Sequence, residues 1–164
     1  MATFKESTTI KLPISTVFTF ISNRRENSKA LENIIDSQKT TAGPIKKGTK
    51  YLLIKKSFMR EYEKRLEIIE IRKNDFISFQ AKSGIFTYIY NYTFLEIEKN
   101  LTGIDFVGII RPSILGKILK PILIDKIDRN HLTHYKNYLE NNSGDNPDPK
   151  DSIEEITEIE EDYA

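Results

Sequence analysis

The sequence predicts an α+β fold, in which a curved antiparallel sheet of about seven strands wraps around a long C-terminal helix. Two short helices are expected after the first strand. Residues 50–110 are a series of segments rich in β-branched and aromatic residues, separated by short polar turns. An amphipathic helical pattern precedes this series and a longer one follows it. The chain has 164 residues, which is enough for one domain with a real core.

The N-terminal segment is expected to form an edge strand and then a helix. Residues 4–12 are rich in Thr and end in the alternation of Ile10 and Leu12, which is typical of a strand. Pro13 suits the first position of a helix, because its missing N–H costs nothing there. We expect Asn23 and the charged run Arg24-Arg25-Glu26 to end this helix. Its apolar face consists of Ile14, Val17, Phe18 and Ile21.

The middle of the chain is expected to form an antiparallel meander. A second short helix is predicted over residues 28–33, and residues 43–49 have the composition of a turn. The breaks between the following segments are short and polar, so neighbouring strands should pair as hairpins. Strands this long must twist and usually curl. The predicted strands cover residues 33–41, 50–58, 60–71, 76–82, 86–97 and 101–110.

The last predicted helix begins at Pro112 and runs to about Glu140. It would have ~28 residues and a length of ~42 Å, and Pro121 should kink it. A helix of that length can cross an entire curved sheet. Because the concave face of such a sheet is too wide for its own side chains to fill, we expect a cavity between sheet and helix. The amphipathic stripe of the helix consists of Ile114, Ile118, Ile122, Leu132, Tyr135 and Leu139.

Charge divides the chain into two parts. Residues 1–141 contain 24 Lys and Arg and 15 Asp and Glu, a net charge of +9. Residues 142–164 contain one Lys and nine Asp and Glu, a net charge of −8, after a segment rich in Asn, Gly and Pro. We therefore expect a ligand-binding domain over residues 1–141 and an acidic, flexible tail over residues 142–164.

Composition excludes several classes of protein. The chain has no Cys, so disulfide scaffolds, thiol nucleophiles and Cys-ligated metal sites are excluded. No apolar segment reaches the ~18 residues that a transmembrane helix needs, and the N-terminus lacks the apolar core of a secretory signal. We expect a cytoplasmic protein. No phosphate-binding loop, dinucleotide fingerprint or nucleophile elbow occurs, so no cofactor is expected.

The order of these segments resembles the helix-grip (SRPBCC) superfamily, which includes START domains, birch-pollen-allergen-like proteins and polyketide cyclase/dehydrase-like proteins. The resemblance covers about residues 3–141. It implies a helix-grip fold with a cavity, whereas function varies between members and must be argued from the site. The segments that carry it are Ile10-Lys11-Leu12-Pro13-Ile14-Ser15-Thr16-Val17-Phe18, Gly43-Pro44-Ile45-Lys46-Lys47-Gly48-Thr49, Glu67-Ile68-Ile69-Glu70-Ile71, Tyr92-Thr93-Phe94, and a helix end with Arg129, Leu132, Tyr135-Lys136 and Leu139-Glu140.

An aromatic stripe with a period of two supplies the main candidate binding site. Residues at this spacing share one face of a strand, so they would form one wall of a ligand pocket, with phenol hydroxyls to orient a polar group. The alternative is ordinary cross-strand packing. The predicted cavity wall consists of Tyr88, Tyr90, Tyr92 and Phe94, with Ile77, Phe79 and Phe106 from neighbouring strands and Ile118 and Ile122 from the last helix.

Two further patterns each have a structural interpretation as well as a functional one. His131 and His134 share one helical face, as in a metal site, but no third ligand accompanies them, so we expect no metal and instead a pair at the helix C-terminus. Glu63 and Arg65 belong to an alternating charged row with Glu61 and Glu67 that is either solvated or a buried acid–base pair. The opposite face of the strand would then place Lys64 in the core. Because a lysine fits a core position badly, a bulge that changes the strand register is an alternative.

A basic cluster marks a surface that could meet a partner. It either contacts a membrane or a protein, or is simply solvated. No nucleic-acid-binding motif accompanies it, so we expect no nucleic-acid partner, and the sequence does not define an oligomeric state. The acidic tail could fold back onto this cluster. The cluster contains Arg24, Arg25, Lys29, Lys46, Lys47, Lys55, Lys56 and Arg60.

Three functions follow from these features. The first is binding or carrying a hydrophobic small molecule, such as a lipid or a polyketide-like compound, in the cavity. The second is an enzyme of the cyclase or dehydratase type that uses the same cavity through positioning and one or two polar groups. The third is a protein-interaction module that uses the basic body and the acidic tail.

Overall fold

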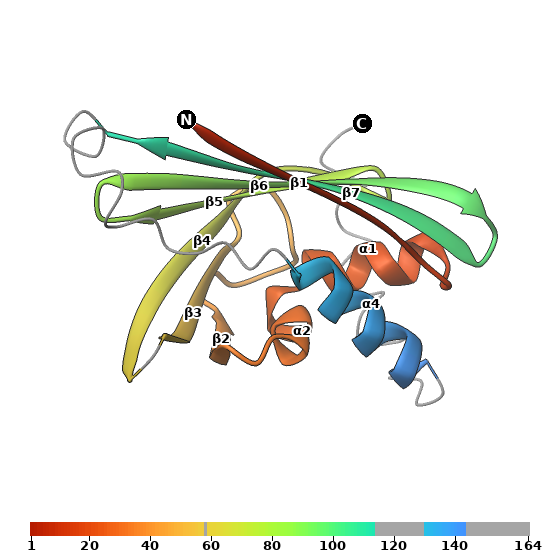
Figure 1. The fold of residues 1–164 in the computed structure, drawn as a ribbon, viewed down its shortest axis with the longest axis horizontal. Helices are drawn as coiled ribbons and strands as arrows, with labels where there is room; N and C mark the ends of the chain where they lie inside the picture. Colours follow the sequence, from red (N-terminus) through yellow and green to blue (C-terminus); the bar gives the residue numbers. More distant parts are fainter. Residues whose placement is uncertain (58, 114–129, 144–164) are drawn as a thin grey trace.

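The computed structural model describes residues 1–57, 59–113 and 130–143. Seven strands form one antiparallel sheet in the order β1-β7-β6-β5-β4-β3-β2. Figure 1 shows the sheet curving so that β4, β3 and β2 turn down around the helices, which all lie on its concave side. The α+β fold predicted from the sequence is confirmed.

The N-terminal elements supply one edge of the sheet and the first helices. Strand β1 (Ala2–Ile10) pairs only with β7, as expected for an edge strand. Helix α1 (Ile14–Ser22) follows Pro13, and its buried face includes Val17, Phe18 and Ile21. The charged residues after it do not simply end the helix, because α2 (Arg24–Asn27) and the 3₁₀ helix η1 (Ser28–Ala30) begin there.

Strands β2 to β7 form the predicted meander. Asn74 and Gly84 have φ values of 56° in two of its hairpin turns, a conformation that Asn and Gly adopt at low cost. The strand ends differ from the prediction by a few residues, and the bulge in β4 falls between Ile68 and Glu70, beyond the position of Lys64. The strands are β2 (Ile34–Lys39), β3 (Lys50–Ser57), β4 (Arg60–Arg72), β5 (Phe76–Ser83), β6 (Phe86–Glu98) and β7 (Leu101–Pro112).

The predicted helix from Pro112 to Glu140 is confirmed at its C-terminal end, over residues 131–140, but is wrong at Pro112 and at Asn130. Pro112 is the last residue of β7, at the end of a strand, where a missing N–H is tolerated. Helix α4 (His131–Asn142) begins after Asn130, which has non-helical dihedral angles. Its 12 residues span ~18 Å. The predicted kink at Pro121 lies outside the described residues.

The core fills the space between the concave face of the sheet and the helices. Phe18 of α1 packs edge-to-face on Phe94 of β6, with ring centroids 5.2 Å apart. Phe20 meets Tyr135 and Tyr138 of α4, both at 5.6 Å. Helix α1 is therefore held between the sheet and α4. None of the helices in the described ranges has the length and hydropathy needed to cross a membrane.

Burial predicts a contrast between two isoleucines. Ile68 in β4 is fully buried, whereas Ile35 in β2 is 51% exposed. Ile68→Ala should lower the free energy of unfolding by about 2–5 kcal/mol, because it leaves a cavity in the core. Ile35→Ala makes the same chemical change and should cost less than about 1 kcal/mol. Urea unfolding of both variants checks this, and equal losses would show that the assigned faces of the sheet are wrong.

Candidate functional site

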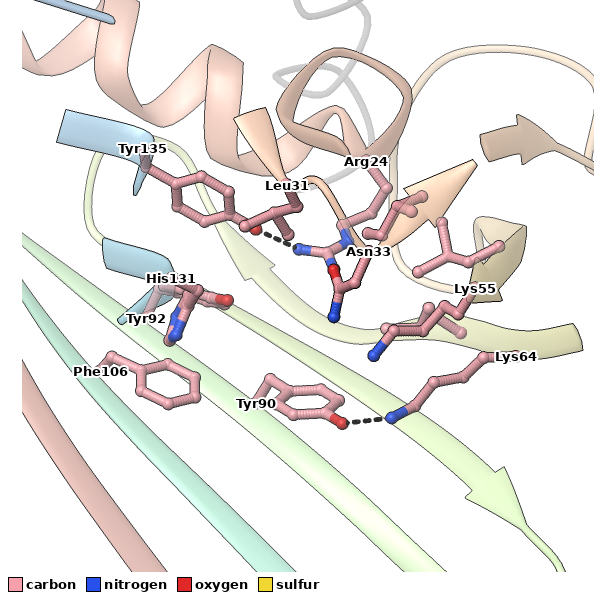
Figure 2. Close-up of a pocket in the computed structure, with 13 residues that line it drawn as sticks. Arg24, Leu31, Asn33, Lys55, Lys64, Tyr90, Tyr92, Phe106, His131 and Tyr135 are labelled. Atoms are coloured by element: carbon pink, nitrogen blue, oxygen red, sulfur yellow. Dashed lines mark hydrogen bonds between the residues drawn. The ribbon is translucent and has the colours of Figure 1, made fainter. Parts of the chain in front are cut away.

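A cavity of about 60 Å³ lies between the concave face of the sheet and helices α2 and α4. Its lining combines aliphatic and aromatic side chains with several cationic and phenolic groups. Figure 2 shows Arg24 and Tyr135 on one side of it and Lys64 and Tyr90 on the other. The lining residues are Arg24, Leu31, Asn33, Ile34, Leu53, Lys55, Lys64, Leu66, Tyr90, Tyr92, Phe106, His131 and Tyr135.

Local backbone contacts place Arg24 at the cavity. The Asn23 side chain caps α2 by accepting a hydrogen bond from the Arg25 backbone N–H at 3.1 Å, so the helix starts at Arg24. The Arg24 carbonyl accepts hydrogen bonds from Ser28 Oγ at 2.7 Å and Ser37 Oγ at 3.1 Å. These bonds tie the start of α2 to η1 and to β2. The Arg24 side chain is consequently directed inward and is only 8% exposed.

The Arg24 guanidinium is surrounded by aromatic groups. Its Nη1 donates a hydrogen bond to Tyr135 Oη at 3.0 Å, and its Cζ lies 5.3 Å from the centroid of the Phe79 ring. Such a cation–π contact is favourable for a desolvated guanidinium. Burial lowers the pKa of Arg24, but the phenols around it, Tyr135 first, raise that pKa by more. The group therefore remains a cation.

Tyr135 connects this cation to the rest of the helical layer. Its hydroxyl accepts from Arg24 and donates to Asn27 Oδ1 at 3.4 Å. Asn27 is itself held by α1, because its Nδ2 donates to the carbonyls of Ile21 at 2.8 Å and Phe20 at 3.2 Å. One buried hydrogen-bond network thus joins α1, α2 and α4.

Lys64 supplies a second cation on the opposite side of the cavity. It is buried on the inner face of β4, and its Nζ donates a hydrogen bond to Tyr90 Oη at 2.7 Å. The same Nζ lies 4.4 Å from the Tyr88 ring centroid and 5.3 Å from that of Tyr90. An ammonium beside a phenol can stabilise the phenolate or hold the phenol as a hydrogen-bond acceptor. Lys64 therefore makes Tyr90 a candidate for transferring a proton to or from a bound molecule.

His131 closes one end of the site from the start of α4. Its ring packs edge-on against Phe106 at 4.2 Å and Tyr135 at 5.5 Å between centroids. Its Nδ1 lies 3.5 Å from Glu6 Oε2 on β1. The histidine therefore links α4 to the edge strand. It begins the helix, which corrects the expectation of a pair near the helix C-terminus.

Tyr92 lines the cavity close to Arg24, and its ring centroid lies 5.0 Å from that of Phe106. Burial raises its pKa well above the usual value, and the nearby charge of Arg24 opposes this shift only in part. The phenol therefore stays protonated at neutral pH. It can act as a hydrogen-bond donor to a bound molecule.

The structure places the predicted wall residues in two groups. Tyr90, Tyr92 and Phe106 line the cavity, and β-sheet pairing sets Tyr92 directly opposite Phe106. The others in the described ranges pack in the core without lining the cavity, namely Tyr88, Phe94, Ile77 and Phe79. Ile118 and Ile122 lie outside the described residues.

The structure corrects one interpretation of each of two charged patterns. Arg65 and Glu63 are 3.9 Å apart with side chains 83% and 61% exposed, so the alternative of a buried acid–base pair is wrong. The basic cluster is not one solvated surface, because Arg24 and Lys55 line the cavity. The described residues include no group of three or more His, Asp or Glu that could hold a metal.

Sequence reasoning missed several lining residues. The charged run that Arg24 begins indicates a surface position, and the cap at Asn23 is a local signal that a new helix starts there. Asn33 and Leu31 follow η1 and have no pattern that marks them. Lys64 did carry a signal, since it interrupts the apolar face of β4.

Comparison with known proteins supports the fold. The chain has the helix-grip fold. It superposes on the di-domain ARO/CYC BexL from the BE-7585A biosynthetic pathway with a TM-score of 0.68 and 10% identity, covering 87% of this chain and 48% of that one. A START superfamily protein from Mycobacterium smegmatis gives a TM-score of 0.63 at 8% identity, with 85% and 94% of the chains covered. Ara h 8.0201 gives a TM-score of 0.61 at 13% identity, with 86% of this chain and 99% of that chain covered.

The sequence itself carries little trace of these relationships. No family model matches it, and no curated protein is significantly similar in sequence. At 8–13% identity, the similarity extends to the helix-grip fold and not to the residues of the cavity.

The network around Tyr135 predicts an effect of a single hydroxyl. Tyr135→Phe leaves Arg24 and Asn27 without this partner and should lower the free energy of unfolding by about 1–3 kcal/mol. Tyr138→Phe on the same helix is the matched control, because both rings pack on Phe20. The control should change stability by less than about 0.5 kcal/mol. Chemical unfolding measures both, and equal effects would contradict the role assigned to the Tyr135 hydroxyl.

The raised pKa of Tyr92 predicts a loss of stability at high pH. The unfolded chain ionises this phenol near pH 10, whereas the folded chain keeps it protonated. The contribution of the protonated phenol to the free energy of unfolding is therefore complete below about pH 10 and is lost progressively as the pH rises above it. The free energy of unfolding of the wild type, relative to Tyr92→Phe, should be lower at about pH 11 than at about pH 8, with the fall beginning near pH 10. A difference that stays constant between these two conditions would refute the assignment.

Proposed function

We propose that this protein binds a hydrophobic small molecule at the cavity between its sheet and its helices. The observation that carries the proposal is the cavity itself, a partly open space at the concave face where apolar and aromatic groups meet a few polar ones. That combination is typical of small-molecule sites. The presence of the same fold in an ARO/CYC protein and a START superfamily protein supports it.

The size of the cavity defines what the described residues accommodate. A volume of about 60 Å³ is well below the ~300–1,000 Å³ of a site for a drug-sized molecule. It suffices for a polar end group of a few atoms. The apolar body of a ligand therefore needs movement of the aliphatic lining, which consists of Leu31, Ile34, Leu53 and Leu66.

Mass spectrometry of the freshly purified protein tests this proposal. Native and denaturing spectra should differ by the mass of a bound molecule, and extraction with organic solvent should recover an apolar compound. The control is Leu53→Trp, which fills the cavity from β3 and should abolish the extra mass while the chain still folds. If the protein is free of ligand and no apolar compound raises its thermal unfolding midpoint, the proposal fails.

A second candidate function, an enzyme of the cyclase or dehydratase type, is favoured by the hydrogen bond between Lys64 and Tyr90. This pair lies in the cavity, where a phenol and an ammonium could move a proton on a bound substrate. Tyr90→Phe separates the two candidates. For a carrier, the variant should retain the compound recovered from the wild type unchanged, whereas for an enzyme the compound recovered should shift toward unreacted substrate.

A further inference from the structure

Among the described residues, the buried cation at the cavity has no anionic partner. Arg24 is 8% exposed, and its contacts are with neutral groups, namely the Tyr135 hydroxyl, the Phe79 ring and the Tyr92 phenol. No ion pair involves it within the described ranges, whereas Lys29, Arg65 and Arg72 form exposed ion pairs. The buried Arg24 thus differs from Arg65 and Arg72 in lacking a carboxylate there.

A lone buried guanidinium is costly unless something compensates it. Charged groups taken out of water are normally paired, because the loss of hydration is worth several kcal/mol per ion. Tyr135 accepts from Nη1, but the buried Nε has no hydrogen-bond partner among the described residues. An oxyanion accepts hydrogen bonds from the guanidinium fork more strongly than a neutral group does. The geometry therefore leaves Arg24 ready for an anionic ligand.

The rest of the lining is compatible with an anion. None of the described residues that line the cavity is acidic, and Lys55 and Lys64 have the same sign of charge as Arg24. The nearby Glu6 carboxylate lies 3.5 Å from His131, on β1. Tyr92 adds a phenol that burial keeps protonated, so it can donate a hydrogen bond. An acidic ligand would meet attraction here, whereas a second cation would meet repulsion.

The volume narrows the choice of anion. A cavity of about 60 Å³ has room for a few water molecules or a small polar group. That space suits the three heavy atoms of a carboxylate better than the larger head of a phospholipid. The planar carboxylate also matches the geometry of the guanidinium.

We propose that the ligand is an organic carboxylic acid with an apolar body, whose carboxylate is bound by Arg24. This inference rests on the proposed function and names the class of ligand. Arg24 donates to the carboxylate, and Tyr135 orients the guanidinium through Nη1. The apolar body then lies against the aliphatic side of the lining.

Two probes that differ only in their head groups test the inference. Octanoate and 1-octanol have the same chain length, but only octanoate has a negative charge. Calorimetric titration of both compounds into the full chain near neutral pH should give about tenfold or more tighter binding of octanoate, as expected for a charge-assisted hydrogen bond. In Arg24→Gln this preference should disappear. In the control Arg65→Gln, which changes an arginine that is 83% exposed, the preference should persist.

A second variant keeps the inference testable if Arg24→Gln does not fold. Arg24→Lys keeps the positive charge but lacks the planar fork, so it should retain part of the preference, and circular dichroism establishes that each variant is folded. Equal binding of the two probes by the wild type, or an unchanged preference in folded Arg24→Gln, overturns the inference while leaving the proposed function intact. If neither probe binds the wild type, the inference fails, and mass spectrometry of the purified protein decides the proposed function separately.

Discussion

The hydrogen bond between Arg24 and Tyr135 is the contact on which the arrangement of the helices and the cavity depends. It joins two residues 111 positions apart, one at the start of α2 and the other in the middle of α4. Through Asn27 the same network reaches the carbonyl groups of α1. Three short helices, each marginal alone, are therefore held over one sheet by a buried polar network. The cavity is the space that remains beneath it.

The inner face of the sheet has a mainly apolar region and a region with polar groups. Around Phe94 and its cross-strand partner Ile104 the face is mainly apolar, and α1 covers it through Phe18. Around Tyr90 the same face carries phenols and cations, which are expensive to bury. Apolar packing in the first region can support the polar groups of the second. This division explains how a shared fold can accommodate different chemistry in its cavity.

Several elements were predictable because they depend on local pattern. The meander of strands followed from alternation and short polar turns, and α1 followed from Pro13 and the spacing of its apolar residues. The last helix was not predictable in the same way. Pro112 fits the start of a helix or the end of a strand equally well, and pairing with Phe86 across the sheet decides for the strand. The aromatic stripe identified the correct face, but not which of its rings border the cavity.

The sequence by itself determined which face of each strand is apolar, because side chains alternate along a strand with a period of two. It therefore placed Tyr90, Tyr92 and Phe106 among the inward residues. Only the tertiary structure decided that Arg24 is buried and that Lys64 reaches Tyr90. A charged side chain is solvated by default, so its burial depends on partners far away in the chain, which no local pattern encodes. The chemistry of the site comes from those distant contacts.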